Sequence, residues 1–516
     1  LYITLDSLHP PLTQTMAAMI VDFQNCSIFI LLCFFTFLCY SVFFFFKKTN
    51  DLGPSPPSLP IIGHLHHFLS GLPHKAFQKI STKYGPLLHL HIFSFPIVLV
   101  SSPTMAHEIF TTHDLNISSR NTPAIDESLL FGPSGFTVAP YGDYVKFIKK
   151  LLATKLLRPR AIEKSRGVRA EELKQFYLKV QDKALKKESV EIGKETMKFT
   201  NNMICRMSIG RSFSEENGEV ETLRELIIKS FALSKQILFV NVLRRPLEML
   251  GLMSLFKKDI MDVSRGFDEL LERVLAEHEE KREEDQDMDM MDLLLEACRD
   301  ENAEYKITRN QIKSLFVEIF LGGTDTSAHT TQWTMAELVN NPNILGRLRD
   351  EIDLVVGKER LIQETDLPNL PYLQAVVKEG LRLHPPAPLL VRMFDKKCVI
   401  KDFFKVPEKT TLVVNVYGVM RDPDSWEDPN EFKPERFLTS KQEEEKVLKY
   451  LPFAAGRRGC PATNVGYIFV GISIGMMVQC FDWSIKEKVS MEEVYAGMSL
   501  SMAHPPKCTP VSRLSL

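Results

Sequence analysis

The chain lacks any dense or paired cysteine pattern. Its nine cysteines include no Cys-x-x-Cys pair and no regular spacing, whereas a small secreted domain held together by disulfides would show both. This absence predicts a reducing compartment, in which at most one or two cysteines take part in chemistry. The net charge is also small, −2, so overall charge gives no attraction toward nucleic acid or acidic membrane.

Two further absences limit the function. No glycine-rich loop closes a strand-to-helix turn, so the chain shows no site of its own for NADPH or flavin. No internal repeat of about 20–50 residues is visible, which argues against a solenoid or a propeller. The 516 residues would suggest about three domains at roughly 150 residues each, yet no flexible linker separates them.

One segment near the beginning is strongly apolar. Cys26 to Phe46 contains no charged residue, and as a helix it spans about 31 Å, enough to cross a bilayer core. Lys47 and Lys48 follow, which places the downstream part in the cytosol. We expect an N-terminal segment at 1–25, a transmembrane anchor at 26–46 and a basic, proline-rich hinge at 47–63. Met16 is a candidate for the true start, and a cleaved signal peptide is the alternative interpretation of the run.

The rest of the chain, residues 64–516, has mainly helical periodicity. Apolar residues recur at three- and four-residue spacing in Val168–Lys187, Arg265–Arg282 and Gln311–Leu338. Short β-branched runs occur at Ile97–Val100 and Thr410–Val414, too few for a large sheet. We therefore predict a mainly α fold with a small β part. The acidic stretch Glu277–Asp292 is expected to be a solvated helix end and loop.

A single cysteine near the end has unusual neighbours. Gly456 and Gly459 let the backbone fold tightly around Cys460, so that backbone N–H groups can hold a thiolate. The helical pattern that starts at Val465 would add a favourable dipole. These features predict that Cys460 is a metal ligand: a thiolate bound to haem iron would assist O–O cleavage. Arg458 would neutralise a haem propionate, and Phe453 would pack beside the ligand and restrict water. The alternative is a buried structural cysteine.

A second constellation lies inside the long helical pattern at 311–338. Gly322 and Gly323 each cost about 1 kcal/mol relative to alanine in a helix interior, and space for dioxygen and substrate above a flat cofactor is one reason to keep them. Asp325 and Thr326 follow directly. Heterolytic O–O cleavage needs two protons, which an acid–alcohol pair can deliver. The alternative is a kinked helix with a capping Asp and Thr.

These motifs resemble those of the cytochrome P-450 superfamily. Residues 453–460 fit its haem signature F-x-x-G-x-R-x-C, residues 322–327 fit its oxygen-activation motif (A/G)-G-x-(D/E)-T-(T/S), and Glu379-x-x-Arg382 and the P-E-R-F text at 434–437 follow in the family's order. The resemblance covers about residues 50–512. It implies a haem-thiolate monooxygenase, with Asp325 and Thr326 as the catalytic pair. It also implies a buried structural triad of Glu379, Arg382 and Arg436, although a three-residue Glu–Arg spacing alone is typical of surface ion pairs.

The resemblance assigns further residues to haem. Arg392 would meet a propionate, because a guanidinium fork suits a carboxylate. Lys149 stands where the family usually has arginine, and Val145 stands where it usually has tryptophan. Val145 predicts weaker haem retention than in typical relatives, which a Val145→Trp variant would improve, and it leaves open that the chain is an inactive member. Ala462 replaces a usual glycine, and we expect this change to be tolerated.

The substrate assignment rests on likeness as well. The texts at 366–373 and 421–423 are typical of plant members, and the nearest group oxidises triterpenoids and related specialised metabolites, followed by flavonoid-oxidising members. A hydrophobic small molecule fits the apolar wall that the resemblance implies. That wall comprises Phe131, Phe136, Val138, Ile237, Leu238, Phe239, Phe316, Phe320, Gly322, Gly323, Leu390, Val391 and Met502. Ordinary core packing is the alternative for each of them.

The expected partners follow from the chemistry. Haem b, O2 and a lipid bilayer are required, and electrons from NADPH would arrive through the flavins of a separate cytochrome P-450 reductase. A basic patch of Lys146, Lys149, Lys150 and Arg457 could bind this reductase. We expect the protein at the endoplasmic reticulum membrane, which it would cross once, with its catalytic part in the cytosol. No nucleic acid partner is expected. A reductase-independent haem-thiolate isomerase or dehydratase and a non-enzymatic haem sensor are the alternatives; the intact Asp325–Thr326 pair disfavours the first and is superfluous for the second.

Overall fold

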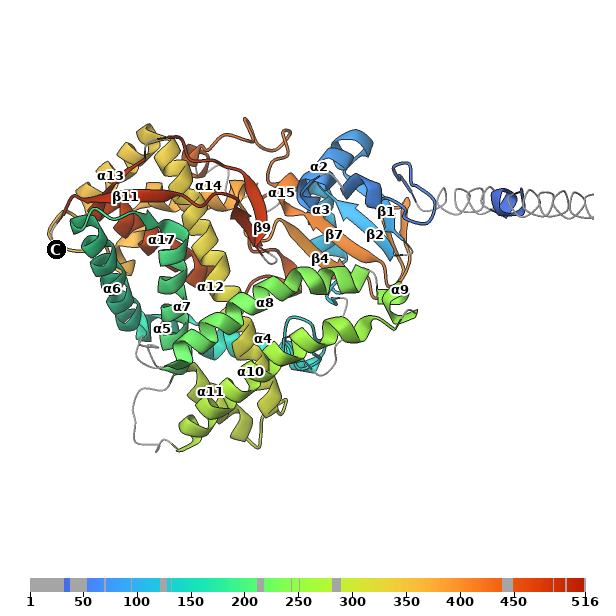
Figure 1. Ribbon diagram of the computed structural model, residues 1–516, viewed down its shortest axis with the longest axis horizontal. Coiled ribbons are helices and arrows are strands. Elements are labelled where there is room, and N and C mark those ends of the chain that lie inside the picture. The colour runs from blue at the N-terminus through green and yellow to red at the C-terminus, as the bar shows by residue number, and fades with distance from the viewer. Residues whose placement is uncertain are drawn as a thin grey trace, which may run out of the picture.

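Helices make up most of the molecule (Figure 1). The computed structural model describes residues 32–37 and 53–514, apart from 69–70, 94, 121–127, 131, 211–217, 243, 250, 281–288, 439–448, 486 and 497–498. The α-helices are α2 (Pro73–Tyr84), α3 (Pro103–Thr112), α4 (Asp143–Leu151), α5 (Pro159–Lys164), α6 (Arg166–Leu185), α7 (Ile192–Ile209), α8 (Gly218–Val242), α9 (Arg244–Met249), α10 (Met253–Glu280), α11 (Met290–Arg299), α12 (Arg309–Asn340), α13 (Pro342–Val355), α14 (Pro371–Leu383), α15 (Val416–Val419) and α17 (Thr463–Cys480).

Shorter helical turns and small sheets complete the fold. The turns are η1 (Leu65–Phe68), η2 (Leu152–Leu156), η3 (Glu364–Asn369), η4 (Pro434–Phe437) and η6 (Gly456–Arg458). The strands are β1 (Leu87–Ile92), β2 (Phe95–Val100), β3 (Val190–Glu191), β4 (Leu389–Met393), β5 (Cys398–Ile400), β6 (Phe404–Val406), β7 (Thr411–Asn415), β8 (Phe481–Ser484), β9 (Glu493–Ala496), β10 (Ser499–Met502) and β11 (Lys507–Ser512). The prediction of a mainly α fold with a small β part is confirmed.

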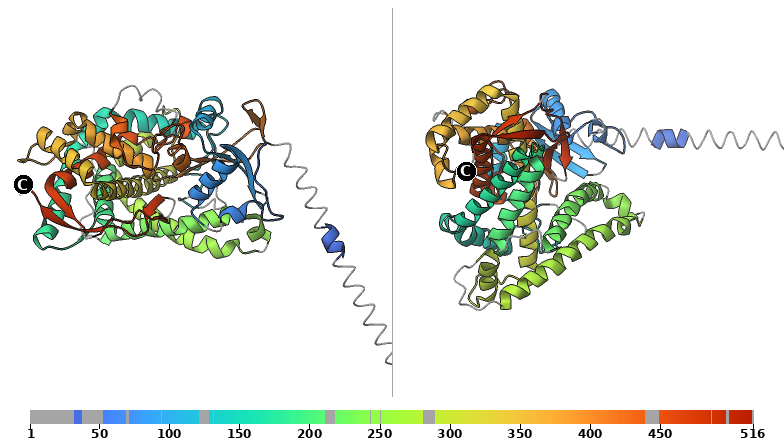
Figure 2. Two further views of the ribbon diagram at one scale, coloured as in Figure 1. Left: turned by 90° about the horizontal axis from the view of Figure 1, so that it is seen from above. Right: turned by 60° about the vertical axis from the view of Figure 1, so that its left-hand side comes forward.

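The long helix α12 passes through the middle of the helical body (Figures 1 and 2). Its N-terminus is fixed by a capping box, in which Thr308 and Gln311 each bond the other's backbone N–H. Most side chains between Ile312 and Leu338 are buried, so tertiary packing rather than amphipathicity stabilises it. It packs against α7, α14 and α17, which makes it the element that positions side chains from several helices around one centre.

The four-stranded sheet lies at one end of the molecule, with α2 and α3 beside it (Figure 1). Its strand order is β1-β2-β7-β4, with β2 and β7 parallel and the other two pairings antiparallel. Alternate residues of β2 face opposite sides, as a pleated strand requires. Val98 and Val100 join one apolar cluster, while Ile97 and Leu99 join another. The sheet is therefore covered on both faces, and β4 delivers Arg392 toward the helical body.

Three smaller sheets hold the chain's later segments in place. Their orders are β3-β11-β8, β10-β9 and β5-β6. Strand β9 ties to α2, because Glu493 bonds His74 Nε2 at 3.1 Å and Lys75 Nζ at 2.6 Å. A contact between residues some 420 positions apart thus connects α2 with the C-terminal part.

The apolar run at 26–46 lies mostly outside the described residues. Residues 32–37 form a helix with exposed side chains at Leu32, Phe34, Phe35 and Phe37. Among the described helices, α17 is the one that has the length and hydropathy to cross a membrane, but 72% of its apolar window is buried inside the protein. We therefore assign α17 to the core, and the anchor at 26–46 stays a prediction.

Candidate functional site

A cavity of about 400 Å³ lies between α12, α17, the loop before α17 and the segment that precedes α4. Its wall is mostly apolar, and cysteine and arginine side chains interrupt it on one side. The lining includes Arg120, Phe136, Thr137, Ile204, Met207, Leu315, Glu318, Ile319, Gly322, Gly323, Thr326, Leu390, Arg392, Phe453, Arg458, Gly459, Cys460, Ala462, Val465, Phe469 and Val470. The cysteine motif and the acid–alcohol motif, 134 residues apart in the sequence from Cys460 to Thr326, thus meet at one space.

Cys460 is held in a tight loop at the start of α17. Its backbone N–H donates to the carbonyl of Phe453 at 2.9 Å, and Thr463 donates its hydroxyl to the carbonyl of Cys460 at 3.1 Å. The side chain of Cys460 is exposed and lines the cavity. Burial raises the pKa of the thiol, and the backbone N–H of Ala462 opposes this rise. A backbone N–H group beside the sulfur, that of Ala462, thus favours the thiolate.

The two loop glycines have steric roles instead. Gly456 has φ of +71°, and a Cβ there would lie 2.1 Å from Oδ1 of Asp114. Asp114 accepts from the backbone N–H of Arg457 at 3.0 Å and pairs with its guanidinium at 2.6 Å. A Cβ on Gly459 would approach the carbonyl of Gly456 at 3.2 Å. The glycines thus let this loop close around the sulfur and dock on the segment after α3.

Three arginines converge on the same side of the cavity. Burial, together with repulsion from Arg120 and Arg458, lowers the pKa of Arg392 to about 9. Burial and Arg120 likewise lower the pKa of Arg458 to about 10, and burial lowers the pKa of Arg120. The Nε atom of Arg120 is buried and has no hydrogen-bond partner among the described residues. Buried like charges with an orphaned donor indicate that an anion belongs here.

Haem fits these observations. Its two propionates are the kind of paired carboxylate that the three guanidinium groups would neutralise, and its iron would meet the sulfur of Cys460 across the apolar space. Phe453, Arg392 and Arg458 line the cavity, and Gly456 shapes the loop that carries Cys460. Their expected contacts with haem stay predictions. Arg120 was missed, because it lies in an irregular segment that no motif marks.

Arg458 also orders the wall of the cavity. Its guanidinium donates to the carbonyls of Ser118, Phe136 and Ala139 at 2.7, 2.8 and 2.5 Å. Its own carbonyl accepts from Nη2 of Arg392 at 3.2 Å. One side chain next to the cysteine therefore fixes the segment that carries Phe136 and Thr137.

The two glycines in α12, Gly322 and Gly323, have different roles. A Cβ on Gly323 would lie 2.1 Å from Cδ1 of Ile204, so this glycine allows α7 to approach closely. A Cβ on Gly322 would meet nothing within 4 Å, and Gly322 lines the cavity. The prediction that these glycines leave space beside a cofactor thus describes Gly322, while Gly323 serves helix packing.

Asp325 and Thr326 point in different directions. Thr326 lines the cavity and donates its hydroxyl to the carbonyl of Gly322 at 2.7 Å. Asp325 is buried and lies 3.2 Å from Nδ1 of His329, one helical turn further on. Its Oδ2 has no hydrogen-bond partner among the described residues. The alcohol thus faces the cavity and the acid lies behind it, in the wall.

The Glu379–Arg382 pair is completely buried. Arg382 donates Nε and Nη2 to Glu379 at 2.7 and 2.9 Å, and Nε of Arg436 lies 3.4 Å from the same carboxylate. Arg382 also donates to the carbonyls of Met420, Pro429 and Glu431 at 2.9, 2.7 and 3.1 Å. The three residues tie α14 to the segment before the cysteine loop, which agrees with the structural role proposed for them.

The expected substrate wall is only partly assembled by the structure. Phe136, Gly322, Gly323 and Leu390 line the cavity. Val138, Ile237, Phe316, Phe320, Val391 and Met502 are not among the described residues that line it. Val391 is 45% exposed on β4, Phe316 and Phe320 pack in the helical core, and Met502 packs on Trp333. Phe131 and the side chains of Leu238 and Phe239 lie outside the described residues.

Neither unusual residue of α4 lines the cavity. Lys149 donates Nζ to the carbonyl of Arg457 at 2.5 Å, and burial lowers its pKa. Val145 is fully buried in the helical core, so a tryptophan there would have to displace its neighbours. Val145 thus belongs to the core, and its predicted effect on haem retention stays a prediction.

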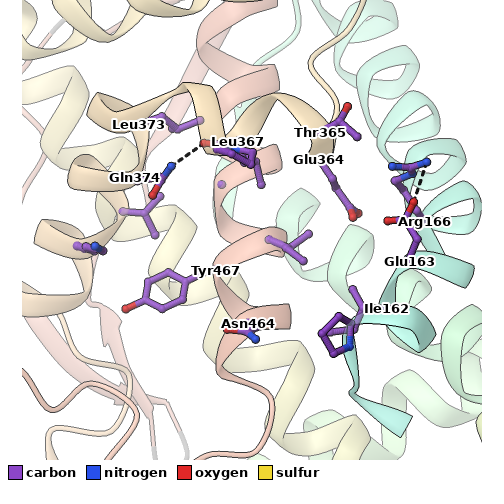
Figure 3. A pocket seen from close by; sticks show the side chains of 16 residues that line it. Ile162, Glu163, Arg166, Glu364, Thr365, Leu367, Leu373, Gln374, Asn464 and Tyr467 are labelled. Atoms are coloured by element: carbon purple, nitrogen blue, oxygen red, sulfur yellow. Dashed lines mark hydrogen bonds and ion pairs between the residues drawn. The ribbon is translucent and has the colours of Figure 1, made fainter. Parts of the chain in front are cut away.

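A second cavity, of about 620 Å³, lies on the other side of α17 (Figure 3). Asn464, Tyr467, Ile468 and Gly471 face it, whereas Val465, Gly466, Phe469 and Val470 face the first cavity. Its lining includes the Glu163–Arg166 ion pair at 2.9 Å, and Glu364 and Gln374 are further polar residues there (Figure 3). It contains neither Cys460 nor Thr326, so the chemistry belongs to the first cavity.

The chain matches known proteins along most of its length. A family model described as Cytochrome P450 matches residues 54–510. The protein named Cytochrome P450 705A12, from Arabidopsis thaliana, is 66% identical over 502 residues, which cover 96% of this chain and 98% of that protein. The Glycine max protein named 3,9-dihydroxypterocarpan 6A-monooxygenase is 37% identical over 510 residues, covering 94% and 98%.

Solved structures agree on the fold. The structure of a zebra fish cytochrome P450 with progesterone matches this chain with a TM-score of 0.74 and 23% sequence identity. The matched region covers 86% of this chain and 100% of the zebra fish chain. At this level of identity the likeness concerns the fold alone.

Proposed function

The chain belongs to the cytochrome P450 family, and from this we propose that it inserts one oxygen atom from O2 into a triterpenoid-like or flavonoid-like molecule at the endoplasmic reticulum membrane. A P450 monooxygenase acts on a hydrophobic substrate with haem iron and needs a redox partner. The observation that carries the proposal is the meeting of Cys460, three arginines and Thr326 at one mostly apolar cavity.

Haem, when bound, supplies the iron at which O2 is activated. The residues of the chain would bind the cofactor and limit the access of water to it. Cys460 offers a sulfur whose loop is shaped by Gly456 and fixed by the Phe453 carbonyl. Arg120, Arg392 and Arg458, which line the cavity, would hold the propionates of the cofactor through charge-assisted hydrogen bonds. Phe453, Val465 and Phe469 limit water around the sulfur.

Proton delivery falls to Asp325 and Thr326. The hydroxyl of Thr326 faces the cavity, where it can turn from the Gly322 carbonyl to donate its one hydrogen bond to dioxygen while it accepts from an ordered water. Asp325 lies on the adjacent position with one unpartnered oxygen, Oδ2. Water entering beside Thr326 would connect the carboxyl with the cavity, which gives the acid–alcohol pair a route for two protons.

The substrate class is supported by the wall and by relatives. Ile204, Met207, Leu315, Ile319 and Leu390 make the space above Thr326 apolar. One relative is named as acting on a dihydroxypterocarpan, a fused-ring phenolic compound. A rigid multi-ring molecule with few polar groups suits both observations.

Electrons would come from NADPH through a separate flavin-containing reductase. The surface on the cysteine side carries the basic patch of Lys146, Lys149, Lys150 and Arg457. Three of these cations have acidic neighbours, since Lys146, Lys150 and Arg457 pair with Asp143, Glu304 and Asp114. Exposed pairs of this kind are weak, so an acidic partner can still compete for the cations.

The test is expression with a plant reductase and NADPH, followed by a panel of triterpenes and flavonoids. We expect at least one product whose mass is greater by one oxygen atom, and the oxygen should carry label from ¹⁸O2. NADPH-dependent turnover without incorporation of labelled oxygen would contradict the proposal.

A further inference from the structure

Glu318 is a charged residue in the apolar wall of the cavity that no part of the proposed chemistry uses. It lies on α12 four residues before Gly322 and eight before Thr326, so the three share one helix face, and all three line the cavity. Leu315, Ile319 and Ile204 surround it. A carboxyl group in such a wall needs a reason, because burying it without full hydrogen bonding is costly.

The two oxygens of Glu318 have different surroundings. Oε1 accepts the backbone N–H of Thr137 at 2.8 Å and its hydroxyl at 2.5 Å. Oε2 is buried and has no hydrogen-bond partner among the described residues. One oxygen therefore anchors the segment before α4, to which the backbone of Phe136 also bonds the carboxyl. The other oxygen is left without a hydrogen-bond partner among the described residues.

The chemistry around Glu318 limits what that group can be. Burial raises the pKa of Glu318 to about 7, although Thr137 and Arg120 oppose the rise. At neutral pH Oε2 thus alternates between an acceptor and an O–H donor. Arg120, Arg458 and Tyr144 are the other ionisable groups near it, and the two arginines disfavour a cationic partner. A hydroxyl group both donates and accepts, so it satisfies either state of the carboxyl.

We propose that Glu318 recognises a hydroxyl group on the substrate. Eight residues separate it from Thr326, which corresponds to about 12 Å along the helix axis. The substrate is therefore an apolar molecule that already carries an alcohol or phenol at about this distance from the carbon to be oxidised. The preceding reaction, which makes this substrate, must therefore leave a hydroxyl group on it. This inference rests on the proposed function and deepens it.

The test uses imidazole probes with the purified holoprotein. The imidazole nitrogen binds haem iron and shifts the Soret band, and rigid aryl tails of three lengths end either in a hydroxyl or in hydrogen. We expect the wild type to bind one hydroxyl probe roughly tenfold more tightly than its matched partner, the effect of one hydrogen bond to a charged group. Glu318→Leu should abolish this preference, and Glu318→Gln, which keeps the Thr137 bonds, should reduce it.

Glu337→Gln is the matched control. Glu337 lies on the same helix but accepts from Nε2 of His384 at 2.8 Å, and it is not among the described residues that line the cavity. This variant should keep the wild-type preference. A wild type that discriminates no pair, or a Glu318→Leu variant that still discriminates, overturns the assignment and leaves Glu318 as an anchor for Thr137. A wild type whose Soret band responds to no imidazole contradicts the proposed function itself.

Discussion

Arg120, Arg392 and Arg458 are the residues that most directly demand a cofactor. The charge of Arg120 lowers the pKa of both Arg392 and Arg458. Glu318, the carboxyl that lines the same cavity among the described residues, has a raised pKa. Without an anion between them this arrangement would be unfavourable. Two haem propionates would turn the repulsion into charge-assisted hydrogen bonds, and the orphaned Nε of Arg120 would gain a partner.

Replacing Arg120 should therefore weaken haem binding. In Arg120→Leu we expect haem to transfer to excess apomyoglobin about tenfold faster than in the wild type, since one hydrogen bond to a charged group is lost. The control is Arg166→Leu, which removes a partly exposed arginine at the second cavity. Equal transfer rates in Arg120→Leu and the control would show that Arg120 does not touch the cofactor.

The hydroxyl of Thr326 gives a second prediction at this scale. Thr326→Ala should lower product formation by about 10²-fold, the lower end for loss of general acid catalysis, while NADPH oxidation continues and hydrogen peroxide is released. Product and peroxide per NADPH are the measurements.

Thr331→Ala is the matched control for this experiment. Thr331 makes the same type of bond to the carbonyl four residues earlier, at 2.9 Å to Ser327, and it is not among the described residues that line the cavity. If both variants stay fully coupled, the hydroxyl of Thr326 has no part in proton delivery.

The contact between α2 and β9 shows how elements far apart in sequence hold the fold. Burial opposes ionisation of Glu493, but hydrogen bonds from His74 and Lys75 bring its pKa down to about 2. A carboxyl with a depressed folded-state pKa stabilises the protein above its unfolded value, near 4.5. This contribution is lost as the pH falls from there toward 2.

Glu493→Gln should remove that contribution. We expect the free energy of unfolding at pH 7 to fall by about 3 kcal/mol, and the difference from the wild type should shrink on acidification through pH 4. Urea unfolding at pH 7 and pH 4 measures both. Glu492→Gln changes the exposed neighbour, which pairs with exposed His504 at 3.4 Å, and should have little effect. A Glu493→Gln variant as stable as the Glu492 control would contradict the role of this contact.

Much of the element-level organisation could be predicted from the sequence, because the signals for it lie within short segments of the chain. The helices around Asp325 and after Cys460 have continuous apolar patterns, and the cysteine loop has a fixed motif. Arg120, Glu318 and the role of Gly323 could not be predicted, because each depends on a long-range contact: the charges of Arg392 and Arg458, Thr137 of another segment, and Ile204 of α7. Val391 was misplaced because the pleat of β4 directs it outward while Arg392 points in.

At the scale of the whole molecule, the proposed docking surface is the basic patch of Lys146, Lys149, Lys150 and Arg457, in which Lys149 bonds the carbonyl of Arg457. If a reductase docks there through charge, reduction should slow as salt rises, because screening shortens the Debye length to about 10 Å at 0.1 M. At low salt, we expect reduction of the Lys149→Glu variant to be slower than that of the wild type. The Lys507→Glu variant, whose change lies on β11, should be reduced at the wild-type rate. Stopped-flow reduction measures the rates, and a flat salt profile would count against charge-based docking.

The whole account depends on a bond between the sulfur of Cys460 and haem iron. The most direct measurement is the absorption spectrum of the reduced, carbon-monoxide-treated holoprotein. We predict the long-wavelength Soret band of thiolate-bound haem in the wild type and its loss in Cys460→His, in which haem binding should persist with an imidazole-type band. An imidazole-type band in the wild type, or the thiolate band in Cys460→His, would contradict the account.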